Sequence, residues 1–111
     1  MRGIPAALLD QRVTIQSKQV TRDGYGAEMI EWADDATVWM QVEPLSGREY
    51  TSMRAAQSDV TTRFRMRYRA GVTTAQRLQW RGRAFAITEV IDSDADRAVL
   101  ELMAYAEETP T

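Results

Sequence analysis

Four arginines alternate along one segment of the chain and are the residues best placed for recognition chemistry. They occupy every second position of residues 63–69: Arg63, Arg65, Arg67 and Arg69. Alternate residues of a β-strand share a face and lie about 6–7 Å apart, so a strand here presents four guanidinium groups in a row. Guanidinium groups bind carboxylates and phosphates through paired hydrogen bonds. The row therefore predicts an acidic protein partner or a nucleic acid.

A third interpretation is that the arginine row is a solvated strand face that pairs with acids of the same chain. The candidate partners are Glu28, Glu31, Glu89 and Glu101. The chain has 14 basic and 16 acidic residues and a net charge of −2, which excludes a globally basic nucleic-acid binder. All three interpretations of the row remain open from the sequence.

Residues for catalysis are scarce. The chain has no histidine and no cysteine, which removes serine–histidine triads, thiolate nucleophiles and cysteine-ligated zinc. Only lysine or carboxylate side chains could activate its serines, and no sequence spacing indicates that a serine pairs with one of them. Neither a Walker loop nor a Gly-x-Gly-x-x-Gly motif is present. We therefore expect no enzyme, no cofactor, no metal and no small-molecule substrate.

Two acidic clusters have the composition of metal or catalytic sites. Residues 92–96 have an aspartate at every second position, as at the start of a calcium loop. However, Arg97 stands where an EF-hand needs glycine. Met103 stands where it needs glutamate. Asp34 and Asp35 are adjacent. We interpret both clusters as turns between strands.

The elements that would position these residues are β-strands, because alternation of polar and apolar residues dominates the chain. The expected strands are residues 12–16, 28–32, 36–43, 60–69, 78–80, 85–91 and 98–105. Asp23-Gly24 and Arg81-Gly82 mark turns, and Pro44 ends a strand. The sequence therefore predicts a mainly β fold, a small antiparallel β-barrel of six to seven strands with one short helical or loop insertion.

We expect a single domain over residues 1–111, with residues 1–10 and 107–111 peripheral, because no linker or repeat interrupts the pattern. The first ten residues carry one positive charge and an apolar run too short for a signal peptide. No segment approaches the roughly 18 apolar residues of a membrane span. These features predict a protein made in the cytoplasm, without a membrane partner.

The insertion lies between Pro44 and Asp59. Ser46 and Glu49 have the spacing of a capping box, which predicts a helix over residues 48–57. Tyr50 and Met53 would then share one side of that helix. The segment is either a small lid over the barrel end, with these two side chains in the core, or a mobile loop.

Two places carry more apolar surface than a small barrel needs. Trp39 is out of phase with the apolar residues of its own strand. The last strand is apolar on both faces, with Val99, Met103 and Tyr105 opposite its leucines. A strand that is apolar on both faces is buried on both faces. The cover is either another subunit or the N-terminal segment 4–9.

Several segments, in order, resemble one protein family. They are LDQRVTIQ (9–16), TRDGYG (21–26), Trp32, ATVW (36–39), EPLSGRE (43–49), RYRAG (67–71), RGRAFAI (81–87) and VID (90–92). Together they resemble the head closure, or head–tail joining, proteins of tailed phages. The resemblance covers about residues 9–105.

The resemblance implies a β-barrel that assembles with itself as a ring, typically twelvefold, in the connector below the portal of a phage or prophage particle. The ring would join a portal-side adaptor protein to the tail terminator or other tail proteins and retain packaged double-stranded DNA in its channel. It implies no catalytic site. It also implies a virion protein that assembles in the host bacterial cytoplasm.

Family members close the channel with a loop between two barrel strands, and residues 46–58 occupy the matching position. The implied plug residues are Ser46, Arg48, Glu49, Tyr50, Met53, Arg54 and Gln57. The candidate subunit or adaptor interface consists of Trp39, Arg63, Arg65, Arg67, Arg69, Val99, Met103 and Tyr105. The alternative function is a small β-barrel module that binds nucleic acid through its Arg63–Arg69 face.

Overall fold

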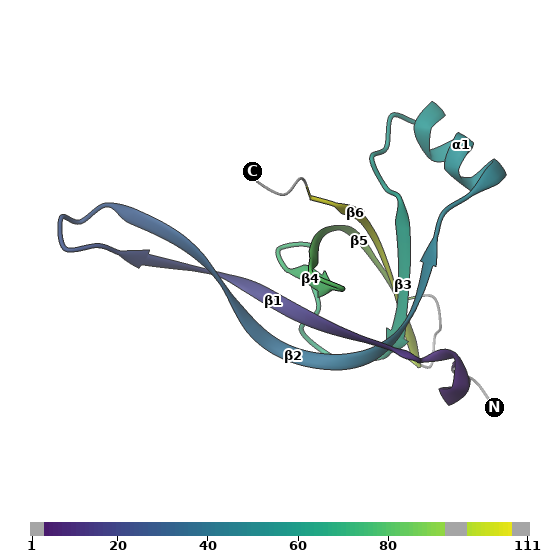
Figure 1. Ribbon diagram of the computed structural model, residues 1–111, viewed down its shortest axis with the longest axis horizontal. Coiled ribbons are helices and arrows are strands. Elements are labelled where there is room, and N and C mark those ends of the chain that lie inside the picture. The colour runs from purple at the N-terminus through teal and green to yellow at the C-terminus, as the bar shows by residue number, and fades with distance from the viewer. Residues whose placement is uncertain (1–3, 93–97, 108–111) are drawn as a thin grey trace.

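A closed antiparallel barrel forms the body of the protein in the computed structural model, which describes residues 4–92 and 98–107 (Figure 1). The elements are η1 (Ala6–Leu8), β1 (Gln11–Arg22), β2 (Glu28–Pro44), α1 (Gly47–Ala55), β3 (Thr62–Arg67), β4 (Arg77–Trp80), β5 (Arg83–Asp92) and β6 (Val99–Ala106). The strands follow the order β1-β2-β3-β6-β5-β4, and β4 closes the barrel against β1. The predicted fold class is confirmed.

The alternation predicted for β3 creates the barrel core. Phe64 and Met66 are buried, whereas the arginines between them face outward. The ring of Phe64 packs edge-on against Trp80 and Phe85, with centroids 6.2 and 5.2 Å away. Buried residues from every strand complete this core: Val13, Ile15, Met40, Leu78, Ile87, Leu100, Leu102 and Ala104.

The predicted break between two strands at Asp34 and Asp35 is wrong, because β2 runs through it as one strand. Ile15 of β1 pairs with Ala36 and Gln16 pairs with Asp34, so Asp35 is an extra residue that forms a β-bulge. The side chain of Asp35 accepts hydrogen bonds from the hydroxyl of Ser17 and from Nε2 of Gln76 (2.9 Å for the latter). Asp35 thus stabilises the bulge.

The bulge determines which way the tryptophans of β2 point. Trp39 pairs with Arg12 and Trp32 pairs with Lys18, and these two partners share one face of β1. Trp32 and Trp39 are seven positions apart, so in an unbroken strand they would lie on opposite faces. Because Asp35 adds one residue, both rings lie on the outer face of the β1–β2 pair.

Beyond the bulge, β1 and β2 leave the barrel as a two-stranded ribbon (Figure 1). β1 pairs with β4 only through residues 14–16, so residues 17–33 pair only with one another. Six residues per strand give this ribbon a length of about 20 Å. It stretches the molecule to 54 Å, against 32 and 25 Å in the other two directions. The sequence analysis predicted a turn here but not the ribbon.

The tight hairpin predicted at residues 81–83, between β4 and β5, is present with a two-residue turn, since Trp80 pairs with Arg83. Arg81 and Gly82 both have positive φ values, 51° and 77°, as a type I′ turn requires.

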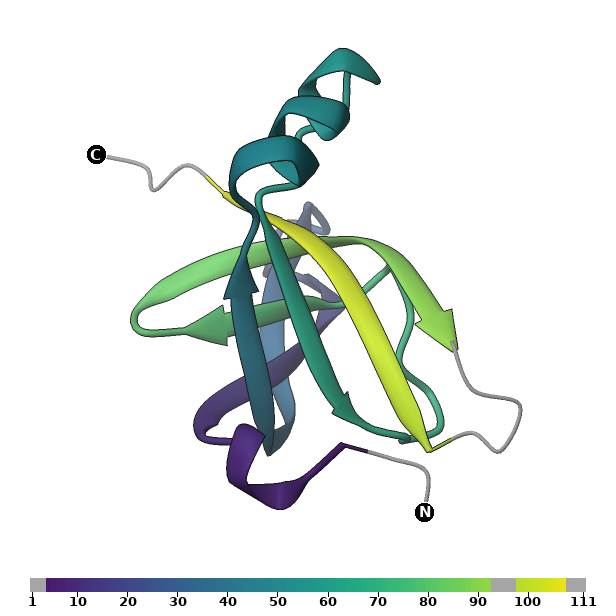
Figure 2. The same ribbon diagram turned by 90° about the vertical axis from the view of Figure 1, so that its right-hand side faces the viewer.

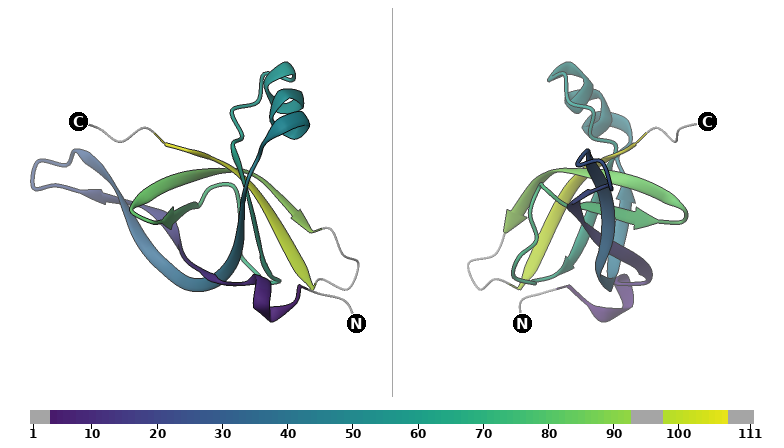
Figure 3. Two further views of the ribbon diagram at one scale, coloured as in Figure 1. Left: turned by 45° about the vertical axis from the view of Figure 1, so that its right-hand side comes forward. Right: turned by 90° about the vertical axis from the view of Figure 1, so that its left-hand side faces the viewer.

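α1 and η1 lie at opposite ends of the barrel (Figures 2 and 3). α1 projects from the end where β2 finishes and β3 begins, and η1 lies against the other end. The predicted calcium-like turn at residues 92–96 falls mostly outside the described residues, as does most of the predicted peripheral tail at 107–111. No helix in the described ranges is long and apolar enough to span a membrane.

Candidate functional site

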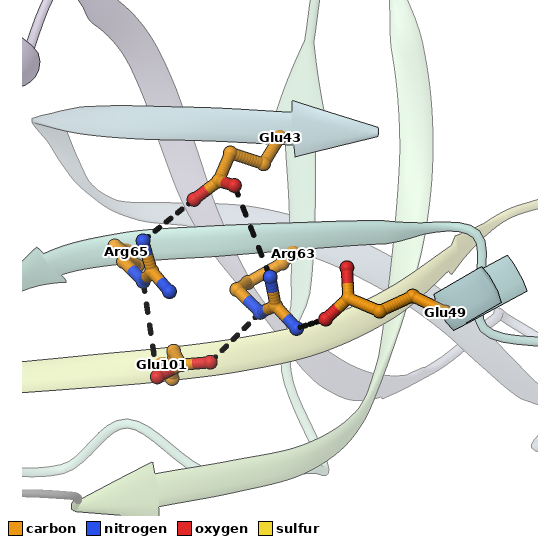
Figure 4. A network of polar contacts seen from close by, with 5 residues as sticks. All are labelled: Glu43, Glu49, Arg63, Arg65 and Glu101. Atoms are coloured by element: carbon orange, nitrogen blue, oxygen red, sulfur yellow. Dashed lines mark hydrogen bonds and ion pairs between the residues drawn. The ribbon is translucent and has the colours of Figure 1, made fainter. Parts of the chain in front are cut away.

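The insertion between β2 and β3 is a helix that starts within one residue of the predicted position. Its capping is different, however. Ser46 is extended, and its side chain makes no hydrogen bond to the helix. Glu49, the expected second member of the capping box, instead binds Arg63 of β3 (Figure 4). The predicted capping box is therefore wrong, because the charged partner on the barrel binds this carboxylate more strongly than a backbone N–H would.

α1 stands out from the barrel end instead of covering it. None of its nine residues is buried, and Tyr50 is 42% exposed. Met53 is partly buried and packs against a small cluster formed by Leu45, Val60 and Met103. Of the two alternatives for this segment, the lid with Tyr50 in the core is wrong, and the segment is a helix whose partly buried Met53 packs on an apolar cluster at its base.

Arg63 and Arg65 belong to a network of ion pairs on the barrel surface (Figure 4). Arg63 Nε lies 2.8 Å from Glu101 Oε1, and Arg63 Nη1 lies 3.8 Å from Glu43 Oε2. Arg65 Nη1 lies 2.6 Å from Glu43 Oε1, and Arg65 Nε lies 3.8 Å from Glu101 Oε2. With Glu49, the network joins α1, β2, β3 and β6.

The network has no excess of positive charge, since two guanidinium groups face three carboxylates. The hydrogen bond from Arg63 lowers the pKa of Glu49, and the same bond raises the pKa of Arg63. The Arg63 side chain is only 13% exposed. These two arginines therefore do not form a free basic strip. Of their predicted partners, Glu101 is found, whereas Glu43 and Glu49 were missed.

The other half of the arginine row has different surroundings. Arg67 is the last residue of β3, and Arg69 follows the strand, so the four arginines do not share one strand face. Within the described part of the chain, neither Arg67 nor Arg69 forms an ion pair. Both line a hollow of about 390 Å³, which we call the Trp39 pocket. Its other lining residues are Leu9, Thr37, Val38, Trp39, Met66 and Tyr68.

Trp39 lies on the barrel surface, as its phase in the strand predicts. It is 50% exposed, whereas the next residue, Met40, is buried. The guanidinium of Arg12 lies 5.1 Å from the centre of its ring. Residues of the N-terminal segment, Ala6 and Leu9, border the same surface. That segment thus lies beside Trp39.

The predicted interface residues of β6 separate into two groups. Met103 is buried beneath Leu45 and Val60, so the chain itself covers it and it cannot form an exposed interface. Neither proposed cover, a second subunit or the N-terminal segment, accounts for its burial. Val99 and Tyr105 are partly exposed.

The arrangement offers surfaces for assembly. The projecting helix and the ion-pair network lie towards the start of β3, and the Trp39 pocket lies at its end. In the described ranges, no three acidic side chains gather in a way that could hold a metal ion.

The sequence model of phage head completion proteins matches residues 4–108 of this chain. The fold is similar to the solution structure of protein SF1141 from Shigella flexneri 2a, with a TM-score of 0.72 and 25% identity over 93% of this chain and 96% of that one. It also resembles a chain in the virion of a native gene transfer agent particle, with a TM-score of 0.56 and 20% identity over 86% and 92% of the two chains. The second likeness concerns the fold alone. No curated protein sequence matches this chain.

Proposed function

Since the chain belongs to the phage head completion protein family, we propose that it forms a ring at the head–tail junction of a phage or prophage particle. The ring joins a portal-side adaptor to tail proteins and keeps packaged DNA inside the head. The role is structural, without catalysis. The match to the family over nearly the whole chain supports this assignment.

The observation that carries the proposal is the exposed helix on a closed barrel. α1 adds about 14 Å beyond the barrel end, and none of its residues is needed in the main core. Copies arranged in a ring would direct one such helix each towards the channel. Arg48 and Arg54 are exposed on it and would supply positive charge for the phosphates of DNA. Arg54 also lies 3.9 Å from Asp59, but both side chains are exposed, so this pair is weak.

The nucleic-acid module that uses the Arg63–Arg69 face is a weaker candidate. Such binding depends on free cations that displace the counterions of phosphates. Arg63 and Arg65 already face three carboxylates at short distance, so only Arg67 and Arg69 of the row are left to meet a polyanion.

Replacing residues 47–57 with a glycine–serine linker of equal length tests the proposal. We expect filled heads to lose their DNA, because the linker removes the channel helix. The barrel should still fold, because its main core contains no residue of α1. DNA retention in filled heads and the melting temperature of the purified chain are the two measurements. Retained DNA with the linker in place would overturn the proposal.

A charge variant gives a finer test with a matched control. Arg48→Gln combined with Arg54→Gln should weaken DNA retention without unfolding the protein, since both side chains are exposed. Arg83→Gln, in the β4–β5 hairpin, removes an exposed arginine elsewhere and should leave retention unchanged.

A further inference from the structure

The ribbon ends in an ordered turn that presents one aromatic ring to solvent. Tyr25 is 99% exposed. Asp23 organises the turn, since its Oδ1 accepts the backbone N–H groups of Tyr25 (2.8 Å) and Ala27 (2.9 Å). Asp23 and Ala27 are also joined through their backbones at 3.0 Å, and Gly26 has the φ of +82° that favours glycine. A tyrosine on a turn whose backbone is held by hydrogen bonds suits a binding anchor, because little loop entropy is lost on contact.

The ribbon tip and its flanks carry an excess of negative charge. Asp23, Glu28 and Glu31 lie within residues 22–31, where Arg22 is the one cation. Arg22 is bound within the tip, 3.6 Å from Glu28 and 3.1 Å from the carbonyl of Gly26. An acidic surface with a protruding tyrosine fits a basic, partly apolar hollow.

The Trp39 pocket has that chemistry. Leu9, Val38 and Met66 give it apolar walls, and Arg67 and Arg69 give it positive charge. Arg12 adds a third cation over the Trp39 ring. The volume of about 390 Å³ is sufficient for an aromatic side chain together with part of its turn.

A chain cannot fill its own pocket with its own tip. The tip lies at one end of the 54 Å axis, and the pocket lies beside η1 towards the other (Figure 1). We propose that the ribbon tip of one copy, with Tyr25 as anchor, inserts into the Trp39 pocket of the next copy. The inference rests on the ring assembly proposed above and identifies the contact that builds it.

The contact joins two different surfaces, so it is head-to-tail, and repetition generates a ring where the rotation closes. The dimensions agree with this geometry. A ribbon about 20 Å long is comparable with the two shorter dimensions of the molecule, 32 and 25 Å, so it can reach well along a neighbouring copy. Each copy then offers one tip and one pocket.

Sedimentation of the purified full chain tests the proposal, with one variant for each side of the contact. Tyr25→Ala removes the tip anchor, and Arg67→Glu with Arg69→Glu reverses the charge of the pocket. We expect the wild-type chain to associate as its concentration rises and each variant to associate at least about 10-fold more weakly. An equimolar mixture of the two variants retains one intact tip and one intact pocket per pair. It should therefore form a one-to-one dimer and nothing larger.

Controls separate the contact from general effects. Tyr25→Phe retains the ring and should associate like the wild type, as should Arg83→Glu, which reverses an exposed charge in the β4–β5 hairpin. The proposal is overturned if Tyr25→Ala associates normally or if the variant mixture stays monomeric. A wild-type chain that remains monomeric up to about 1 mM would overturn it as well.

Failure of the contact and failure of the proposed function can be distinguished. If the tip–pocket contact fails but the linker variant of residues 47–57 still releases DNA, the ring forms through another surface and the head–tail role stands. If the contact is found but DNA is retained by the linker variant, the proposed channel role fails and the contact stands.

Discussion

Arg63 of β3 and Glu101 of β6 contact each other diagonally across neighbouring strands, with Arg63 Nε 2.8 Å from Glu101 Oε1. The same guanidinium also binds Glu49 of α1. One arginine therefore connects the projecting helix to the barrel wall. This connection helps to fix the direction of a helix whose apolar contact at its base is the partly buried Met53.

Removal of Arg63 should destabilise the protein. In Arg63→Met, Glu49 loses its hydrogen-bond donor and Glu43 and Glu101 lose an ion-pair partner, so the free energy of unfolding should fall by about 1.5–3 kcal/mol. Urea unfolding measures this change. The matched control is Arg22→Met, which breaks an exposed pair with Glu28 and should cost only about 0–1 kcal/mol. Equal losses in the two variants would contradict a special role for the network.

The bond between Glu49 and Arg63 should weaken in acid. Arg63 lowers the pKa of Glu49 in the folded protein. The stabilisation is therefore complete above the ordinary glutamate pKa of about 4.3 and is lost as the pH falls through the lowered value. We expect the difference in unfolding free energy between the wild type and Glu49→Gln to be constant at neutral pH and to shrink in acid. A difference that persists unchanged to about pH 2 would contradict this linkage.

Trp39 should matter for association more than for folding. Trp39→Ala should lower the free energy of unfolding by less than about 1 kcal/mol, because the ring is half exposed and loses mainly its contact with Arg12. Phe64→Ala, in the core, should cost about 3–5 kcal/mol. Sedimentation of Trp39→Ala should show weakened association. If Trp39→Ala destabilised the fold as much as Phe64→Ala, the ring would belong to the core.

Local sequence signals predicted much of the barrel. Alternation identified Phe64 and Met66 as core residues, and Gly82 and Pro44 marked a turn and a strand end. These signals are reliable because side-chain periodicity and the φ preferences of glycine and proline act over a few residues.

Long-range register could not be predicted in the same way. The bulge at Asp35 depends on bonds to Ser17 and Gln76, which are distant in sequence. Likewise, Glu43 and Glu49 reach Arg63 only because β2, β3 and α1 meet in space. The capping-box pattern of Ser46 and Glu49 therefore gave a wrong prediction, because Glu49 binds Arg63 of β3 and not the backbone at the start of its own helix.

Reconstruction of the neck of particles from cells that carry this gene, by cryo-electron microscopy, tests the central claim most directly. We predict a closed ring of this chain between the portal side and the tail, with α1 of every copy directed towards the channel axis. A neck that lacks the chain, or a ring whose α1 helices point outward away from the DNA, would contradict the account.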